Sequence, residues 1–253
     1  MTTSVPFDQI ADRYDATRFG LDQRRRVADF FAPWLAPGPV LEIGVGTGLV
    51  GGRLSERGHE VYGVDLSLPM LTKASGRLDG RLFCGDACAL PIPDGALSNA
   101  MFALSLHAIR NVAGAFAEAA RVLRPGGRVL ATYGETIIEP VGGDTDDVMD
   151  ALAPVVQLDV FVRPDNGPAL DAAARSAGLD TVCHTASDKL LWQTSPAFVA
   201  SQLEDRVWSV LWSVDDDTWN RVLVPAIARL RGLPEPERPR HRYHSYPVAI
   251  YER

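Results

Sequence analysis

The sequence contains few cysteines and no recognisable metal-ligand cluster. Its three cysteines, Cys84, Cys88 and Cys183, are a sparse and odd-numbered set in 253 residues. Such a set favours a reducing compartment over a secreted protein stabilised by disulfides. Cys84 and Cys88 lack a second cysteine pair or a nearby histidine, so we expect no metal site.

Three further absences limit where the protein acts and what it binds. No apolar run approaches the roughly 20 residues of a membrane helix. The N-terminus also lacks the basic and then apolar stretch of a secretory signal. The net charge of −7 argues against DNA or RNA as the main partner. We therefore expect a cytoplasmic protein that binds neither membranes nor nucleic acid.

The stretch over residues 40–48 predicts a ligand site. Val-Leu-Glu-Ile predicts a buried strand, glycines follow at positions 44, 46 and 48, and Leu49 and Val50 begin a helix. A glycine turn between a strand and a helix gathers backbone N–H groups at the helix N-terminus. Side chains there would keep a ligand away from the backbone, and such turns often need positive φ. The stretch therefore predicts a nucleotide-like ligand.

Strands and helices alternate five times along the first half of the chain. The expected strands cover residues 40–43, 60–65, 81–84, 96–103 and 128–133, and helices are expected over 48–57, 66–77 and 113–123. This alternation predicts an α/β fold in which a parallel sheet is covered by helices on both faces.

The rest of the chain is expected to complete a single domain over residues 1–253. Two helices over 7–15 and 21–34 form an N-terminal helical lid (1–36), and residues 37–135 form the cofactor-binding core. Beyond it we expect helices over 144–158 and 168–177, a strand over 179–192, a helical stretch over 196–230 and a last strand over 242–251. The helical insertion over 195–235 is a candidate substrate cap.

Acidic residues lie at or near the ends of three expected strands. Asp65 follows the glycine turn by about 20 residues, where a carboxylate can accept from both ribose hydroxyls. Asp86 can accept from an exocyclic adenine amine. Glu42 lies within the first strand, where a charge is costly unless it faces a ligand or a partner. Three acids around one crevice would repel phosphates and favour a nucleoside that carries positive charge.

A second interpretation of the glycine turn is a dinucleotide site. Residues 46–51 satisfy G-x-G-x-x-G, the fingerprint of nicotinamide and flavin sites. In that fingerprint the first glycine directly follows the strand, a place that Gly44 already occupies here. An NAD-dependent oxidoreductase is therefore the weaker alternative. A kinase-type phosphate loop is excluded, because no Gly-Lys-Ser/Thr follows the glycines.

Several motifs, in this order, resemble class I S-adenosylmethionine-dependent methyltransferases, and the type 11 small-molecule group most closely. They are Glu-x-Gly-x-Gly-x-Gly at 42–48, Val-Asp-Leu-Ser-Leu-Pro-Met-Leu at 64–71, Gly-Asp-Ala at 85–87 and Leu-Arg-Pro-Gly-Gly at 123–127. The resemblance implies a Rossmann-like, seven-stranded, mostly parallel sheet with an antiparallel last strand, formed by residues 242–251. It also implies S-adenosyl-L-methionine as the cofactor and S-adenosyl-L-homocysteine as its product.

The resemblance implies roles for individual residues. The glycines hold the amino-acid end of the cofactor, Asp65 its ribose and Asp86 its adenine. Glu42 is expected to hold the glycine loop and, through water, the cofactor's ammonium, and Tyr14 is expected to close over the cofactor. The full set of expected cofactor-binding residues is Tyr14, Glu42, Gly44, Gly46, Gly48, Asp65, Leu66, Met70, Asp86, Ala87 and Ala103.

The reaction expected from the resemblance is methyl transfer to a small organic molecule at O, N or C. Such a displacement needs positioning and exclusion of water. His107, just after the fourth strand, is either the base that deprotonates a hydroxyl or a structural residue. The alternatives keep the cofactor without methyl transfer: a scaffold or regulator, or a cyclase or eliminase that uses the sulfonium charge.

Trp208 and Trp212 share a helical face, which fits a buried contact, a homodimer surface or an aromatic wall for a hydrophobic substrate.

Overall fold

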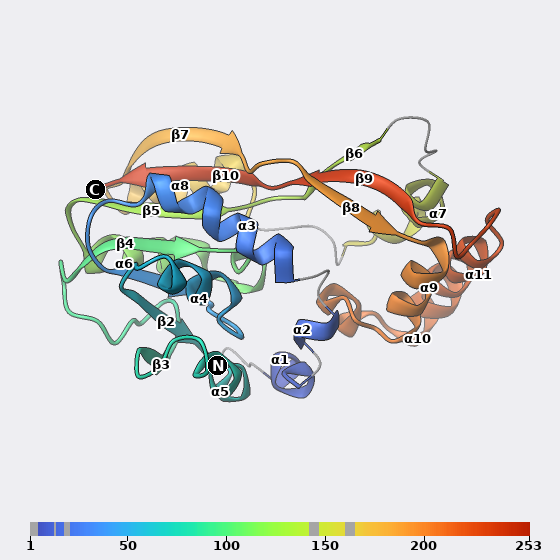
Figure 1. The fold of residues 1–253 in the computed structure, drawn as a ribbon, viewed down its shortest axis with the longest axis horizontal. Coiled ribbons are helices and arrows are strands. Elements are labelled where there is room, and N and C mark those ends of the chain that lie inside the picture. The colour runs from blue at the N-terminus through green and yellow to red at the C-terminus, as the bar shows by residue number, and fades with distance from the viewer. Residues whose placement is uncertain (1–4, 13, 18–20, 142–146, 160–164) are drawn as a thin grey trace. The chain divides into compact units, whose positions relative to one another are not determined.

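The computed structural model describes residues 5–12, 14–17, 21–141, 147–159 and 165–253 (Figure 1). Its chain groups into two compact units. The sheet unit comprises residues 1–135, 164–188 and 246–253, and the helical unit comprises residues 136–163 and 189–245.

A seven-stranded sheet forms the centre of the sheet unit (Figure 1). Its strands are β1 (Val40–Ile43), β2 (Val61–Asp65), β3 (Leu82–Cys84), β4 (Leu97–Phe102), β5 (Leu123–Thr132), β7 (Asp180–Ala186) and β10 (Pro247–Glu252). Their order is β3-β2-β1-β4-β5-β10-β7. Strands β1 to β5 pair in parallel, whereas β10 is antiparallel to both of its neighbours. This confirms the predicted mostly parallel sheet with an antiparallel last strand.

Helices cover both faces of this sheet, as predicted. One face carries α3 (Leu21–Phe31), α4 (Leu49–Glu56) and α5 (Leu68–Ala74), and the other carries α6 (Val112–Val122) and α8 (Gly167–Ser176). The pleat of each strand supplies both cores, because successive side chains point to opposite faces. In β4, Phe102 packs against the α6 and α8 side, and Met101 packs against the α3 and α4 side.

The N-terminal helix expected over 7–15 is wrong as a single element. Two short helices, α1 (Val5–Ile10) and α2 (Tyr14–Thr17), replace it. The expected helix over 21–34 is α3 followed by a 3₁₀ turn, η1 (Ala32–Trp34). Pro33 removes one backbone donor there, which fits the change from an α-helix to a tighter turn.

Carboxylates of α1 and α2 hydrogen-bond to the elements around the glycine turn. The Ser67 hydroxyl, which caps α5, donates to Asp8 over 2.6 Å. The Thr47 hydroxyl donates to Asp15 over 2.6 Å, and Arg77 pairs with the other oxygen of Asp15 over 2.9 Å. The two short helices are therefore attached to the glycine turn and to α5.

The helical unit has its own sheet and its own core. Its strands, β6 (Ile137–Pro140), β9 (Arg240–Ser245) and β8 (Leu190–Thr194), pair antiparallel in that order. Its helices are α7 (Asp147–Val156), α9 (Pro196–Glu204), the 3₁₀ segment η4 (Ser209–Ser213), α10 (Asp216–Thr218), the π-helical segment η5 (Trp219–Leu223) and α11 (Val224–Arg231). Leucine, valine and alanine side chains of these helices form a separate apolar core.

Two of the strands expected beyond residue 178 are wrong, because each divides into two strands of different sheets. The stretch over 179–192 forms β7 and β8, and the stretch over 242–251 forms β9 and β10. The two changes of sheet occur side by side, where Ser187 and Tyr246 exchange two hydrogen bonds of 2.8 and 2.9 Å. Residues that are uncommon in strands mark both junctions, Ser187-Asp188-Lys189 and Pro247, and the prediction of one long strand at each place overlooked them.

Other differences also lie in the helical unit. The helical stretch expected over 196–230 is interrupted, with Arg206 in a left-handed conformation (φ +48°) and the Asp215 carboxylate capping α10 through the Thr218 N–H. The helix expected over 144–158 spans Asp147–Val156, and residues 144–146 lie outside the described residues. Strand β6 was not expected.

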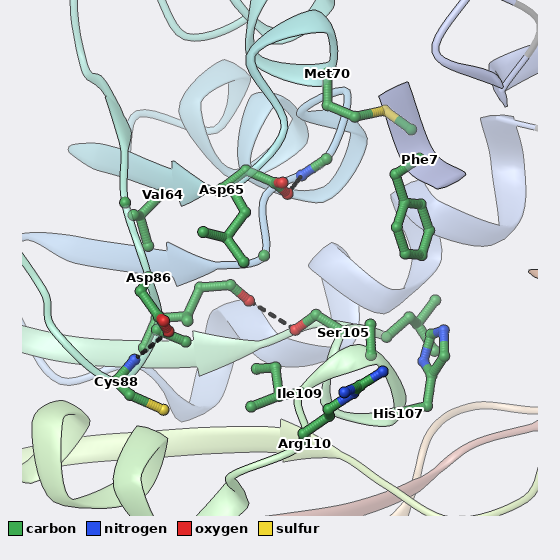
Figure 2. Close-up of a pocket in the computed structure, with 18 of the residues that line it drawn as sticks. Phe7, Val64, Asp65, Met70, Asp86, Cys88, Ser105, His107, Ile109 and Arg110 are labelled. Carbon is green, nitrogen blue, oxygen red and sulfur yellow. Dashed lines mark hydrogen bonds between the residues drawn. The ribbon is translucent and has the colours of Figure 1, made fainter. Parts of the chain in front are cut away.

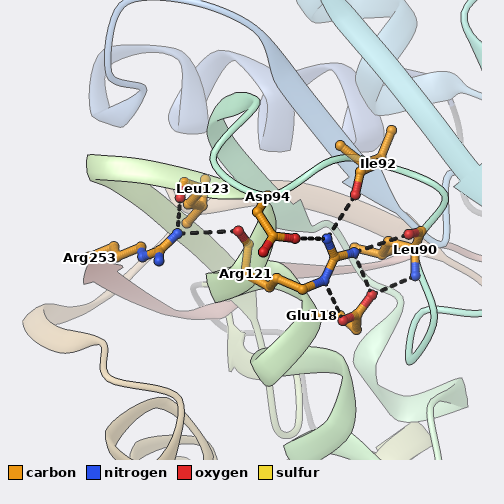
Figure 3. Close-up of polar contacts among 7 residues, drawn as sticks. All are labelled: Leu90, Ile92, Asp94, Glu118, Arg121, Leu123 and Arg253. Carbon is orange, nitrogen blue, oxygen red and sulfur yellow. Dashed lines mark hydrogen bonds and ion pairs between the residues drawn. The ribbon is translucent and has the colours of Figure 1, made fainter.

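Arg121 of α6 fixes the loop that leads from β3 to β4 (Figure 3). Its guanidinium pairs with Glu118 over 2.7 and 2.8 Å and with Asp94 over 2.5 Å. It also donates to the carbonyls of Leu90 (3.1 Å) and Ile92 (2.9 Å). Glu118 in turn accepts from the Leu90 N–H over 2.7 Å. One side chain therefore satisfies several polar groups of a loop that has no regular structure.

Replacing this guanidinium tests its structural role. We expect Arg121→Gln to lower the free energy of unfolding by about 2 kcal/mol, because two carbonyls and two carboxylates lose their donor. Urea denaturation measures the loss. Arg175→Gln is the matched control, since Arg175 is an exposed residue of α8. Equal losses in the two variants would contradict this role.

Candidate functional site

A pocket of about 190 Å³ lies at the carboxyl ends of β1, β2 and β4 (Figure 2). It brings together most of the residues predicted to bind a cofactor or to react: Tyr14, Gly44, Gly46, Asp65, Leu66, Met70, Asp86, Ala87 and His107. Glu42 and Ala103 line a smaller pocket of about 40 Å³, which adjoins the first because both include Tyr14, Gly44 and Gly46. Gly48 lines neither pocket; it precedes α4 and has a φ of +78°.

The glycine turn places its backbone between the two pockets. Gly44 and Gly46 have φ of +76° and +53°, which residues with a side chain rarely adopt. A Cβ on Gly44 would also lie 2.6 Å from the Cβ of Ser105, too close for any side chain. Both backbone conformation and space therefore require glycine at position 44.

Asp65 connects the glycine turn with α5. One carboxylate oxygen accepts from the Gly46 N–H over 2.8 Å, and the other accepts from the Ser67 N–H over 2.9 Å. Burial raises the pKa of Asp65, and the backbone donors oppose that rise. A carboxylate offers about four acceptor positions, so Asp65 can still accept from ligand hydroxyls.

Asp86 closes a tight turn after β3 at one end of the pocket. Its carboxylate accepts from the Cys88 N–H over 2.9 Å, a local hydrogen bond common for aspartate in turns. The carboxylate therefore has a structural contact, and the residue also lines the pocket. Asp86 and Cys88 lie at one end of the pocket, and Phe7, His107 and Arg110 lie at the other (Figure 2).

Glu42 is buried in β1 with 2% of its surface exposed. Its carboxylate accepts from the Gly51 N–H over 2.7 Å. Burial raises its pKa to about 8, while the Gly51 N–H and the positive charge of Arg24 oppose that rise. A Cβ on Gly51 would lie 2.5 Å from the Glu42 carboxylate. The glycine that completes G-x-G-x-x-G is thus explained by its contact with Glu42.

His107 lies on a 3₁₀ turn, η2 (Leu106–Ala108), directly after β4. An unusual backbone precedes this turn: Leu104 has a φ of +58°, and such a conformation costs about 1–3 kcal/mol. The Thr132 hydroxyl accepts from the Leu104 N–H over 2.7 Å, and the Ser105 hydroxyl donates to the Ile43 carbonyl over 2.6 Å. These bonds hold the segment that carries His107 along the pocket.

The pocket residues that were not predicted from the sequence include two arginines and a phenylalanine. Arg24 of α3 lines the smaller pocket together with Glu42. Phe7 and Arg110 line the larger pocket near His107. Arg24 lies within a run of three arginines, and Arg110 lies in a loop, so neither has a local pattern that distinguishes it from a solvated residue.

Among the residues that the structure describes, no helix has the length and apolar character needed to cross a bilayer. Within the same part of the chain, no group of three or more histidine, cysteine, aspartate or glutamate side chains is arranged to hold a metal ion.

The fold and the pocket define a class of protein, a Rossmann-like α/β domain with a pocket at the carboxyl ends of its strands, and comparison with known proteins identifies its family. A family described as "Methyltransferase domain" matches residues 41–131. A demethylmenaquinone methyltransferase of Thermus thermophilus is 40% identical over 136 residues, which are 49% of this chain and 62% of that protein. One from Parafrankia sp. is 32% identical over 188 residues, 63% of this chain and 74% of that protein.

The solved structure of the cyclase SpnF has the same fold. It has a TM-score of 0.58 and 17% sequence identity, and the match covers 98% of this chain and 94% of that one. The identity of 32% to the Parafrankia relative, of which the chain covers 74%, shows that the chain belongs to the class I S-adenosylmethionine-dependent methyltransferase family. It spans less than two thirds of the length of the Thermus relative.

The buried carboxyl of Glu42 makes stability depend on pH. Its pKa is about 8 in the folded protein and about 4.3 in the unfolded chain. Between these values the folded protein keeps a proton that the unfolded chain has released. The free energy of unfolding therefore falls as pH rises from about 5 to 8, by at most about 1.4 kcal/mol per pH unit.

We expect Glu42→Gln to remove this slope, because the amide oxygen still accepts from Gly51 and does not titrate. Urea denaturation of the ligand-free protein at intervals from pH 5 to 8 measures it. Parallel curves for the variant and the unsubstituted protein would show that Glu42 does not titrate in this range.

Proposed function

We propose that this protein transfers the methyl group of S-adenosyl-L-methionine to a small organic molecule at O, N or C, releasing S-adenosyl-L-homocysteine. The observation that carries the proposal is Asp65, whose carboxylate accepts from the backbone of the glycine turn and of the α5 N-terminus while lining the larger pocket. Membership in the methyltransferase family supports it.

The residues present fit this cofactor. Asp65 and Asp86 would receive the nucleoside, with Leu66, Met70 and Ala87 as apolar neighbours. The smaller pocket contains an acid, Glu42, and a guanidinium, Arg24. An oxygen of Glu42 can accept from the ammonium of an amino acid, and Arg24 complements its carboxylate. Arg24 thus becomes the proposed partner of the cofactor's carboxylate.

When bound, the cofactor supplies an electrophilic methyl group, and this chain's residues position the acceptor. Tyr14 and Phe7, from the N-terminal helices, line the larger pocket and would help to exclude water there. We propose residues 1–36 as a lid on that basis. His107 is the candidate base, because it faces the pocket at the end away from Asp86 (Figure 2).

The names of two relatives suggest an acceptor class. The Thermus and Parafrankia relatives are named demethylmenaquinone methyltransferases, which makes a menaquinone-like quinol the first acceptor to test. The helical unit lies outside the 41–131 match, so the acceptor can differ from that of these relatives.

The sparse cysteines also lead us to propose a cytoplasmic location. A homodimer remains a prediction.

Labelled methyl transfer decides between this function and its alternatives. The cyclase SpnF shares the fold, and a protein that binds the cofactor without transferring methyl would share the pocket. Incubation with methyl-labelled cofactor and metabolite extracts, followed by mass spectrometry, should reveal a product that has gained the label. Cofactor binding without a labelled product would favour the alternatives. NADH binding in place of S-adenosylhomocysteine would indicate the oxidoreductase, which the family membership does not favour.

The cofactor assignment is tested at Asp65. We expect Asp65→Ala to weaken S-adenosylhomocysteine binding at least about 100-fold, because two charge-assisted hydrogen bonds to the ribose and the order of the glycine turn are lost. Isothermal titration calorimetry measures it, and Asp79→Ala, at an exposed aspartate, is the control. Unchanged affinity in Asp65→Ala would refute the assignment.

The base assignment is tested at His107. For a hydroxyl acceptor, we expect His107→Asn to lower kcat about 100-fold or more and to change the shape of the pH–rate profile, because asparagine cannot take up the acceptor's proton. S-adenosylhomocysteine affinity should not change. A pH–rate profile that keeps its shape in the variant would give His107 a structural role only.

A further inference from the structure

Arg110 is a positively charged residue that lines the larger pocket. It follows the turn that carries His107, and its guanidinium lies toward His107 and away from Asp86 (Figure 2). No other lysine or arginine lines this pocket among the residues that the structure describes. The charge therefore lies at the end where the acceptor is expected to react.

Arg110 makes no hydrogen bond or ion pair with any described residue. The arginines that support the fold differ in this respect: Arg77 binds Asp15 and the Thr47 carbonyl, and Arg121 binds two carboxylates and two carbonyls. Arg110 is exposed and projects along the pocket, so no contact within the described chain explains its place. All its donors are available to a ligand.

The cofactor does not account for this charge. The nucleoside end of the pocket is defined by carboxylates, Asp65 and Asp86. The proposed partner of the cofactor's own carboxylate is Arg24, which lines the smaller pocket, where Arg110 is absent. Each arginine lines one pocket, so two separate anionic groups can be received.

We propose that Arg110 binds an anionic group of the methyl acceptor, so that acidic small molecules are the preferred substrates. This rests on the proposed methyl transfer. A guanidinium is planar and binds a carboxylate or a phosphate through two parallel hydrogen bonds. Phe7 and Ile109 also line the pocket and offer apolar contact, so the acceptor combines an apolar or aromatic body with an acidic group. Its nucleophilic atom lies near His107.

Matched pairs of acceptors test the proposal. The full-length protein is incubated with labelled cofactor and hydroxybenzoates or aminobenzoates, each beside its neutral amide, with 4-hydroxyphenyl phosphate as the phosphate arm. We expect methylation of the acids, with kcat/KM about 10- to 100-fold above that of the amides. The preferred arm identifies the acidic group as a carboxylate or a phosphate.

Variants of Arg110 connect this preference with the guanidinium. Arg110→Gln should raise KM for the acids about 10- to 100-fold and abolish the preference, while kcat and S-adenosylhomocysteine affinity stay unchanged. Arg110→Lys should restore part of the affinity, because the charge remains without the planar donors. Arg175→Gln, which removes an exposed arginine of α8, should have no effect.

Three results would overturn the proposal while leaving methyl transfer intact. The amides could be methylated as readily as the acids, or the preference for acids could survive in Arg110→Gln. The third result is a loss of S-adenosylhomocysteine affinity in Arg110→Gln that equals its rise in KM for the acids. Cofactor binding with transfer to none of the acids would also overturn it. If S-adenosylhomocysteine does not bind to the unsubstituted protein, the proposed function itself fails.

Discussion

The carboxylate of Asp65 is the interaction on which the rest of the site depends. It accepts from Gly46 on one side and from Ser67 on the other, over 2.8 and 2.9 Å. The glycine turn after β1 and the N-terminus of α5 are thereby held at the end of β2. Burial raises the pKa of Asp65, and these backbone donors oppose that rise. A ligand hydroxyl that donates to the carboxylate would oppose the rise further.

Around this carboxylate, polar side chains hold segments that have little regular structure. Arg77 connects Asp15 of α2 with the Thr47 carbonyl in the glycine turn. Arg121 performs the same task for the loop after Asp86. Both arginines bind partners within the chain. Arg110 differs from both, because it makes no hydrogen bond or ion pair with the described residues and so does not support the fold.

Glu42 shows how one buried acid can determine a sequence motif. A carboxylate facing α4 needs a backbone donor at short range, and Gly51 supplies it at 2.7 Å. No larger residue fits, since its Cβ would lie 2.5 Å from the acid. The match to a dinucleotide fingerprint therefore arises from packing between β1 and α4. It carries no information about pyrophosphate binding.

The sequence by itself determined the alternating strands and helices of residues 40–133 and the two acids that end β2 and β3. Asp65 is the last residue of β2, and Asp86 follows β3 by two residues. These features follow from local periodicity and from strand ends that meet at one edge of a sheet. Only the tertiary structure decided that the chain changes sheets at Ser187 and Tyr246, because residues such as Asp188 and Pro247 can mark a break in a strand without showing which sheet the next strand joins. It alone placed Arg24 beside Glu42 and left Arg110 without a partner among the described residues. Contacts between distant elements have no local pattern, so they emerge only when the chain is folded.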